Sequence, residues 1–262
     1  MAKTSLTNLE GKIILITGAS SGIGAATAMA FAAEGARLLL AARRVGKLAE
    51  VASAALASGA QAVHTFELDV RDRHAVHHAI EMLPSEWSEI DILINNAGLS
   101  RGMDKFHTGL IDDWDEMIDT NVKGLLYVSR AVVPGMVARN HGHIVTLGSM
   151  AGEIVYPNGA VYCASKAAAR FINDGLREDL LGTPIRVTSV DPGLVETEFS
   201  QVRFHGDTER AAKVYNGLTP LVGEDVADVI LWAVTRPAHV NIARVSLTCI
   251  NQANALLVHR ES

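Results

Sequence analysis

Short apolar runs alternate with longer segments of helical periodicity along most of the chain. Seven runs read as strands, and most of them are near-continuous in apolar residues; they span residues 12–17, 36–42, 63–70, 91–98, 143–149, 185–193 and 244–250. Apolar residues recur at helical spacing within 26–35, 114–137, 164–180 and 224–234. Strands that are apolar on both sides fit a sheet with both faces buried. The alternation therefore predicts an α/β fold, a doubly wound parallel sheet in a single domain over residues 1–262.

Composition and charge narrow the classes of partner. Apolar residues make up 48% of the 262 residues, which is enough for a sizeable core. The 23 basic and 29 acidic side chains give a net charge of −6 and are spread along the chain, which argues against a nucleic acid or an anionic membrane as partner. The N-terminal residues are polar, no apolar run approaches the ~18 residues of a membrane span, and two cysteines provide no disulfide framework. We therefore expect a cytoplasmic protein.

Three glycines follow the first predicted strand. Gly18, Gly22 and Gly24 lie in TGASSGIG, where a strand ends and a helix begins. Glycine at such a junction permits a tight turn and lets backbone amides approach a pyrophosphate, which the helix N-terminus also attracts. The spacing G-x-x-x-G-x-G differs from the commoner dinucleotide motif, so an ordinary glycine-rich turn is the alternative. Because a doubly wound sheet binds ligands at the carboxyl ends of its strands, we predict a dinucleotide there.

The end of the second predicted strand indicates which dinucleotide. Enzymes that prefer NAD usually place an acidic residue there for the ribose 2′-hydroxyl, whereas this chain has Ala42 followed by Arg43 and Arg44. A hydrogen bond to a charged group contributes about 1.5–3 kcal/mol, so one arginine on a 2′-phosphate would favour NADP by about one to two orders of magnitude. The alternative is a solvated basic pair that opens the next helix. We predict NADP as the cofactor.

Ser149, Tyr162 and Lys166 form a candidate set for moving a proton on and off an oxygen. Ser149 closes the strand at 143–149, at the same sheet edge as the glycines. Tyr162 and Lys166 are four residues apart at the start of a helix, which places them on one helical face. The pKa of a free tyrosine is about 10, and a neighbouring lysine cation is expected to lower it. The alternative is a buried tyrosine with an exposed lysine one turn on, which the serine upstream disfavours.

In order and spacing, these motifs resemble the short-chain dehydrogenase/reductase family over nearly the whole chain. The matching pieces are TGASSGIG at 17–24, LDV at 68–70, NNAG at 95–98, TN at 120–121, Ser149, YCASK at 162–166 and DPGLVET at 191–197. The resemblance implies a Rossmann-like fold, an NADP-dependent oxidoreductase and a homotetramer. The two long helices would build the interface of that assembly, with close approach allowed by Ala164, Ala167, Ala168 and Ala169.

The resemblance also implies a role for each matching residue. Tyr162 is the general acid for carbonyl reduction and the base in reverse, and Ser149 binds the substrate oxygen. Lys166 lowers the pKa of Tyr162 and holds the nicotinamide ribose. Asn121 anchors a water that relays protons to Lys166, with a packing role inside its helix as the alternative. The cofactor-binding set comprises Gly18, Ser20, Ser21, Gly22, Ile23 and Gly24 in the phosphate turn, Arg43 and Arg44, Asp69 and Val70 against the adenine, Asn95, Ala97 and Gly98 along the cofactor path, Tyr162 and Lys166, and Pro192, Gly193, Val195 and Thr197 at the nicotinamide.

The segment after DPG is expected to cover the substrate as a lid over about residues 194–217. Its cations are Arg203, Arg210 and Lys213; an arginine there would clamp a carboxylate bidentately, with solvated helix charges as the alternative. The C-terminal third most resembles the NADP-dependent 3-hydroxy acid dehydrogenases, which include enzymes that act on serine and allo-threonine. Glu153, in the expected pocket wall, would repel an anionic substrate; the alternatives are that it attracts an amino group or that it points to water. An apolar wall of Met150, Ile154, Tyr156 and Leu194 would suit a bulkier ketone.

Three hypotheses follow for the function. The first is an NADP(H)-dependent oxidoreductase that transfers a hydride between nicotinamide and a small hydroxy or oxo compound, in particular a 3-hydroxy acid. The second is a reductase of neutral or sulfonated ketones and aldehydes. The third, from another class, is a non-catalytic NADP-binding regulator, although degenerate members of the fold usually lack the tyrosine or the lysine. No carboxylate or cysteine completes a site around His74, His77 and His78, so no metal is expected.

Overall fold

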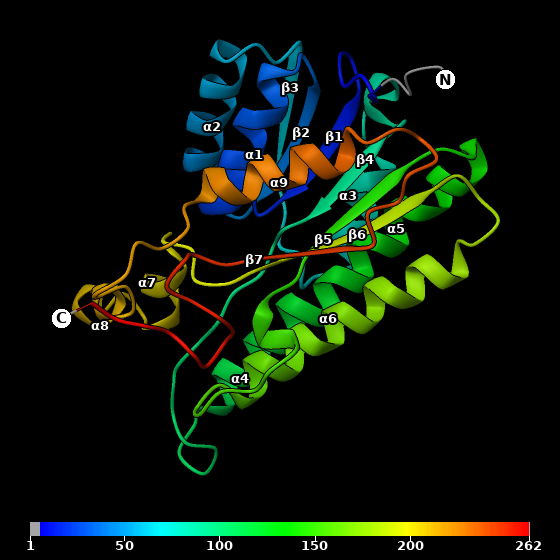
Figure 1. The fold of residues 1–262 in the computed structure, drawn as a ribbon. Coiled ribbons are helices and arrows are strands. Elements are labelled where there is room, and N and C mark those ends of the chain that lie inside the picture. The colour runs from blue at the N-terminus through cyan, green and yellow to red at the C-terminus, as the bar shows by residue number, and fades with distance from the viewer. Residues whose placement is uncertain (1–5, 262) are drawn as a thin grey trace.

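A single parallel sheet organises the chain, and its strand order reverses at one point. The computed structural model describes residues 6–261, and its strands follow the order β3-β2-β1-β4-β5-β6-β7 with each neighbouring pair parallel (Figure 1). The strands are β1 (Ile13–Thr17), β2 (Arg37–Ala42), β3 (Ala62–Glu67), β4 (Ile92–Asn95), β5 (His143–Leu147), β6 (Arg186–Pro192) and β7 (Arg244–Leu247). The chain builds outward from β1 to β3 and restarts at β4 on the other side of β1. The predicted doubly wound parallel sheet is therefore confirmed.

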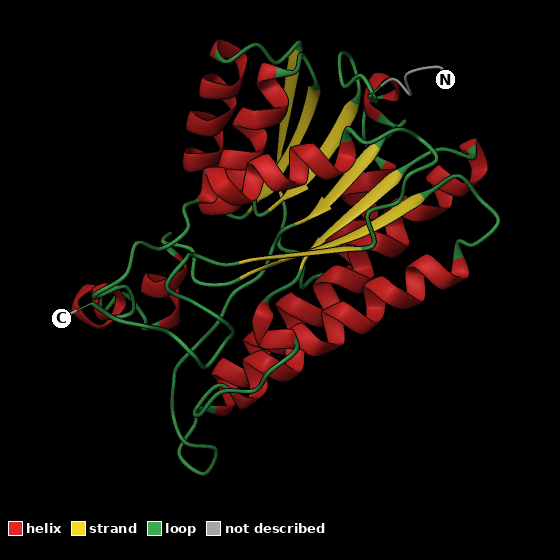
Figure 2. Cartoon of the chain, in the orientation of Figure 1, coloured by secondary structure: helices red, strands yellow, loops and turns green. Residues whose placement is uncertain are grey.

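Helices cover both faces of this sheet (Figure 2). One face carries α1 (Gly22–Ala33), α2 (Val45–Ala57) and α9 (Gly223–Val234); the other carries α3 (Arg73–Glu81), α5 (Leu125–Arg139) and α6 (Ala160–Asp179). The shorter helices are α4 (Ile111–Ile118), before α5, and α7 (Phe199–Arg203) and α8 (Thr208–Lys213), which stand beyond the carboxyl ends of the strands. No helix within residues 6–261 has both the length and the apolar character needed to cross a membrane.

Two apolar layers explain why the strands are apolar on both sides. Ile14 and Ile16 of β1 pack in one layer with Phe31 of α1, and all three are fully buried. Leu15 of the same strand belongs to the other layer, with Met136 of α5. Successive side chains of a strand point to opposite faces, so helices must cover both sides of β1. Each fully buried side chain of this size contributes about 1.5–3 kcal/mol, which favours near-continuous apolar strands.

Several predicted elements end or bend where the carboxyl edge of the sheet begins. β3 ends at Glu67 and β4 at Asn95, rather than at residues 70 and 98, so the residues that follow them lie in edge loops. The helix predicted over 114–137 is α4 and α5 joined by a π-helical segment, Asp119–Gly124. Glycine is required at the end of that segment, because a Cβ on Gly124 would lie 2.7 Å from Val70. Such segments frequently mark functional sites, and this one carries Asn121.

Candidate active site

The turn after β1 has no room for a side chain at two of its glycines, Gly18 and Gly24. Gly18 and Gly22 have φ values of 64° and 53°, which favour glycine. A Cβ on Gly18 would lie 2.9 Å from the Cα of Ala97, and one on Gly24 would lie 2.5 Å from the Gly18 carbonyl oxygen. Because α1 begins at Gly22, its free backbone amides face the same turn. The predicted glycine turn therefore exposes amides at the N-terminus of a helix.

Asn96, which sequence reasoning did not select, holds this turn in place. Its side-chain Nδ2 donates to the carbonyl oxygens of Thr17 and Gly18, at 2.9 and 3.1 Å. The Thr17 hydroxyl in turn accepts from the backbone amides of Asn96 and Ala97, both at 3.1 Å. The signal was present in the NNAG motif, where a second asparagine stands beside the residues that were chosen. The loop after β4 thus fixes the phosphate turn after β1.

A cleft of about 340 Å³ runs along the carboxyl edge of the sheet at the point where strand order reverses. Most of the predicted cofactor-binding and catalytic residues line it: Gly18, Ser20, Ser21, Gly22, Ile23, Arg43, Arg44, Asp69, Val70, Ala97, Gly98, Ser149, Tyr162, Lys166, Pro192, Gly193 and Thr197. Leu99, Arg101, Thr120 and Glu198 also line it and were not selected from the sequence. Segments separated by up to about 180 residues therefore meet in one cavity.

Four predicted site residues lie behind the wall of this cleft rather than in it. Gly24 is inside α1, and Val195 forms an isolated bridge with Leu221. Asn95 is buried and donates to the Ser129 hydroxyl at 3.1 Å. In the described structure these residues contact their neighbours and do not line the cleft.

Asn121 is the fourth of these residues, and its side chain joins three segments. Its Oδ1 accepts from the Leu99 amide at 2.9 Å, and its Nδ2 donates to the Leu99 carbonyl and to the Ser165 hydroxyl at 2.8 and 2.9 Å. Both amide hydrogens are therefore used. The π-helical segment is tied in this way to the loop after β4 and to α6.

The two arginines after β2 reach the cleft but already have acidic neighbours. An Nη1–Oε1 distance of 3.7 Å separates Arg43 from Glu116. Arg44 is held more firmly, because its Nη1 lies 2.7 Å from Glu198 Oε2 and its Nη2 donates to Ser21 Oγ at 2.6 Å. Both arginine side chains are nearly half exposed. They form a basic rim beside the phosphate turn, with Arg43 the less constrained of the two.

Tyr162, Lys166 and Ser149 come together at the inner end of the cleft. Tyr162 and Lys166 lie one turn apart on α6 and are only 8% and 7% exposed. The Lys166 ammonium donates to the Leu147 carbonyl at 2.8 Å. Ser149 follows β5, and its hydroxyl accepts from the Ala151 amide at 3.1 Å. The expected trio of acid, lysine and serine is therefore assembled at one buried place.

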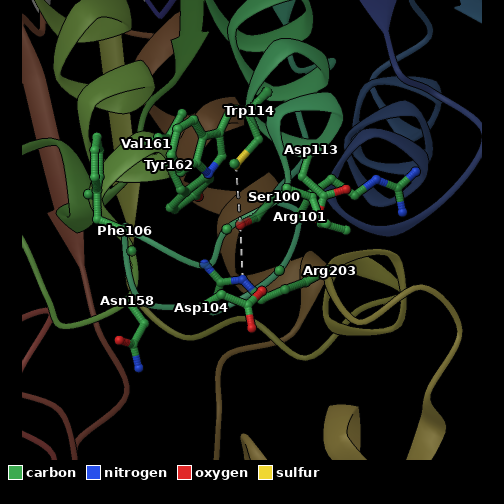
Figure 3. Close-up of a pocket in the computed structure, with 16 residues that line it drawn as sticks. Ser100, Arg101, Asp104, Phe106, Asp113, Trp114, Asn158, Val161, Tyr162 and Arg203 are labelled. Atoms are coloured by element: carbon green, nitrogen blue, oxygen red, sulfur yellow. Dashed lines mark hydrogen bonds between the residues drawn. The ribbon is translucent and has the colours of Figure 1, made fainter.

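Arg203, from the segment predicted to be a lid, lines the same chamber as Tyr162 (Figure 3). The Arg203 Nε donates to the Ser100 hydroxyl at 2.9 Å, and its Nη2 donates to the hydroxyl of Tyr156. Its guanidinium carbon lies 5.2 Å from the ring centroid of Tyr162, and both residues line one small chamber. The other two lid cations are engaged elsewhere: Arg210 stacks on Phe204 at 4.5 Å, and Lys213 pairs with Glu209 at 2.7 Å. Of the three candidates, Arg203 is the cation at the tyrosine.

Burial has the largest effect on the pKa values of Tyr162 and Lys166. It raises the pKa of Tyr162 above the ordinary value, with a further increase from Tyr156, while Arg203 and a hydrogen bond with Ser149 oppose the shift. Burial also lowers the pKa of Lys166 to about 8, against the opposing charge of Asp191. The pKa of Tyr162 is therefore raised rather than lowered in this structure, and Arg203 is the cation that opposes the increase. A lowering effect of Lys166 on that pKa stays a prediction.

Glu153 does not line the chamber of Tyr162 and Arg203, although the sequence places it in the expected pocket wall. It forms an ion pair with Arg244 of β7, which also pairs with the buried Asp191. Within the described part of the chain, Glu153 lines neither the cleft nor the chamber. The expected apolar wall is also absent from both cavities, since Met150, Ile154 and Leu194 do not line them and Tyr156 contacts Arg203. The carboxylate that would have repelled an anionic substrate is neutralised by a partner.

Comparison with known proteins agrees with this arrangement. The family described as short chain dehydrogenase matches residues 12–207. NADP-dependent 3-hydroxy acid dehydrogenase YdfG of Shigella flexneri is 46% identical over 95% of this chain and 100% of its own, and the NADP-dependent 3-hydroxy acid dehydrogenase of Schizosaccharomyces pombe is 46% identical over 98% and 99%. The solved closed form of serine dehydrogenase complexed with NADP⁺ is 46% identical and superposes with a TM-score of 0.89 over 95% of this chain and 100% of that one. The chain therefore belongs to the short chain dehydrogenase family.

Proposed function

We propose that the protein is an NADP(H)-dependent oxidoreductase that interconverts a small 3-hydroxy acid and its 3-oxo acid. The observation that carries this proposal is the Arg203 guanidinium, 5.2 Å from the ring centroid of Tyr162 in the same chamber. A carboxylate bound by that arginine would present a nearby carbinol to the tyrosine hydroxyl. The relatives from Shigella flexneri and Schizosaccharomyces pombe, whose names specify NADP and 3-hydroxy acids, support it.

The cleft fits a dinucleotide that carries a 2′-phosphate. Side chains at Gly18 and Gly24 would collide with the backbone, so the amides of the turn are open to a pyrophosphate. Arg43 and Arg44 line the rim, and Ala42 stands where a carboxylate would select the 2′-hydroxyl. When bound, NADP would supply or accept the hydride.

The remaining cleft residues receive roles from their positions. Asp69 and Val70 lie in the loop after β3 and would contact the adenine, while Ala97 and Gly98 would border the ribose path. Lys166 would hold the nicotinamide ribose, and the wall after β6 would meet the nicotinamide itself. That wall consists of Pro192, Gly193 and Thr197, and Val195 lies in the same segment. Asn95 would act from the end of β4, where it donates to Ser129.

Tyr162 would exchange the proton of the substrate oxygen. In the oxidative direction its phenolate takes the hydroxyl proton, and in reduction the phenol returns it. Ser149 would donate to the same oxygen and so orient it. Lys166, whose pKa is about 8, can lose or gain a proton near neutral pH, and its charged form would favour the phenolate that burial disfavours.

Asn121 would act as a positioning residue beside a proton route. A cavity of about 10 Å³ beside Lys166 is lined by Asn121 and Thr146. Among the described residues, 6–261, the buried Thr146 hydroxyl has no hydrogen-bond partner. A single water in this space would connect that hydroxyl with the lysine. The relay predicted from sequence would use this cavity.

Residues 194–217, which include α7 and α8, would serve as a substrate lid, and α5 and α6 would form the interface of a homotetramer. Exposed Phe171 of α6, at 71%, supports such an interface. Ala169 does not, because it is buried within the subunit at 2%, whereas Ala164 is exposed. Light scattering after size-exclusion chromatography would test the assembly, and a monomer would contradict it. The cytoplasmic location and the single domain stay predictions.

The test of function is NADP⁺ reduction against a panel of alcohols. The panel is serine, allo-threonine, 3-hydroxypropionate, 3-hydroxyisobutyrate, isethionate and a neutral secondary alcohol, each measured also with NAD⁺. We expect the highest kcat/KM for a carboxylic acid with NADP⁺. Preference for the neutral alcohol or for the sulfonate would favour the second hypothesis, and NADPH binding without any turnover would favour a regulator.

A further inference from the structure

Glu198, the residue before α7, is held by two cations from the opposite side of the cleft. Its Oε2 lies 2.7 Å from Arg44 Nη1, and its other oxygen pairs with Lys47 near the start of α2. Arg44 and Glu198 both line the cleft and are separated by 154 residues of sequence. This contact therefore pins the start of the lid to the rim that would receive the ribose 2′-phosphate.

The same arginine is also bonded to the phosphate turn. Its Nε donates to Ser20 Oγ at 3.3 Å, and its Nη2 donates to Ser20 Oγ at 3.2 Å and to Ser21 Oγ at 2.6 Å. With Nη1 on Glu198, four of the five N–H groups of a guanidinium are in use. One N–H group is left, so a phosphate that binds Arg44 through two donors must take at least one donor from these partners.

We propose that Glu198 is a coenzyme-selectivity residue that holds Arg44 and Lys47 as an internal counter-anion and yields them to the 2′-phosphate of NADP(H), releasing the start of the lid. This inference rests on the proposed function, since it requires NADP in this cleft. A dinucleotide without the 2′-phosphate has no anionic group at the ribose 2′ position to take over the two cations, so it leaves the lid pinned. Selectivity would then arise from lid release as well as from direct phosphate contacts.

The exchange is reasonable on electrostatic grounds. Hydrogen bonds from Lys47 and Arg44 lower the pKa of Glu198 to about 2, so the carboxylate is charged throughout the neutral range. Its partners are 45% exposed, and pairs of this kind are weak compared with a bidentate arginine–phosphate contact. Neutralising Glu198 should therefore raise the affinity for a 2′-phosphate about two- to fivefold, the range that an exposed ion pair contributes.

The binding test uses 2′,5′-ADP and 5′-ADP, which differ in the 2′-phosphate and undergo no turnover. Isothermal calorimetry on the full-length protein compares wild type, Glu198→Gln and the matched control Glu196→Gln, an exposed carboxylate with no ion pair within residues 6–261. Glu198→Gln should bind 2′,5′-ADP about two- to fivefold more tightly, with 5′-ADP unchanged and Glu196→Gln like wild type. Unchanged or weaker binding of 2′,5′-ADP by Glu198→Gln would overturn the proposal.

A second measurement reads the lid directly. In α7 the Val202 amide donates to the Glu198 carbonyl at 2.9 Å, so hydrogen exchange over residues 198–204 should rise when 2′,5′-ADP saturates the wild type and stay unchanged with 5′-ADP. Slower exchange with 2′,5′-ADP would refute lid release. The same substitution, Glu198→Gln, is then made in an Arg44→Gln background. There the gain in affinity for 2′,5′-ADP, measured relative to Arg44→Gln alone, should largely disappear. A full gain in that background would exclude Arg44 as the shared partner. Equal wild-type binding of both nucleotides would instead overturn the NADP assignment itself, and with it this inference.

Discussion

Replacing Arg203 by glutamine is the sharpest test of the substrate assignment. The guanidinium is oriented by Ser100 and Tyr156, so no large movement is needed to present it in the chamber of Tyr162. A hydrogen bond to a charged group contributes about 1.5–3 kcal/mol, and about 1.4 kcal/mol corresponds to a factor of ten. We therefore expect Arg203→Gln to lower kcat/KM for the preferred 3-hydroxy acid by roughly 10- to 150-fold.

The same arginine also acts on the tyrosine, and this effect must be separated from substrate binding. Arg203 opposes the increase that burial causes in the pKa of Tyr162. Its loss should raise that pKa and move the rise of the oxidative kcat to higher pH for every substrate. The increase in KM should be confined to acids, because a neutral secondary alcohol has no carboxylate to lose. Arg203→Lys keeps the charge without the planar fork and should fall between the two.

The assay is initial-rate NADP⁺ reduction at several pH values, with one acid and one neutral alcohol from the panel. Arg210→Gln is the matched control, since it removes a lid cation that stacks on Phe204 rather than facing the tyrosine, and it should leave both substrates nearly unaffected. Equal losses for acid and neutral alcohol would refute the carboxylate clamp and leave Arg203 with an effect on the tyrosine alone. Unchanged kinetics with both substrates would refute both roles.

Four further predictions concern the cleft. Tyr162→Phe should lower kcat by about 10²–10⁴ while a fluorescence titration finds NADPH binding retained; an unaltered kcat would contradict its role as acid and base. Arg43→Ala should raise the Kd for NADPH far more than that for NADH, and equal changes in the two would argue against a phosphate ligand. Burial lowers the pKa of Lys166 from 10.5 to about 8, so the folded chain loses this proton above pH 8 while the unfolded chain keeps it until about pH 10.5. Lys166→Met should therefore raise the free energy of unfolding below pH 8 by at most roughly 3 kcal/mol, with the gain shrinking toward pH 10.5 in urea titrations; a pH-independent gain would contradict the shift. Gly24→Ala would place a Cβ 2.5 Å from the Gly18 carbonyl oxygen, so we expect a lower Tm and lost NADPH binding, and wild-type values for both would show that the turn can relax.

The parts of the site that were predictable depend on local geometry. Tyr162 and Lys166 are one helical turn apart, and the glycines after β1 stand at a strand–helix junction, so their placement follows from rules of helices and turns. Ser149 required one more step, which was that parallel strands bring their carboxyl ends to a common edge. These relations hold before any tertiary contact is known.

The parts that could not be predicted depend on which charges meet across the fold. Nothing near Glu153 in the sequence indicates that it pairs with Arg244 of β7, so it was wrongly placed in the substrate wall. The pKa of Tyr162 was expected to be lowered beside Lys166, but burial of the side chain raises it. Both errors come from long-range packing, which decides the dielectric surroundings and the partner of each charge.

The reversal of strand order separates, along the sequence, the segments that line the two ends of the cleft. This separation matters for engineering. Segments before residue 102 furnish Arg43, Arg44 and the loops after β1 to β4. The proposed proton-transfer groups, the proposed lid and the cleft wall after β6 come from segments after residue 118. A designer could therefore graft a foreign lid onto this chain to change its substrate while leaving the nucleotide half intact. The contact of Arg44 with Glu198 crosses that boundary. A graft that begins after position 198 would inherit the native coenzyme preference, and one that replaces this position would alter coenzyme and substrate choice together.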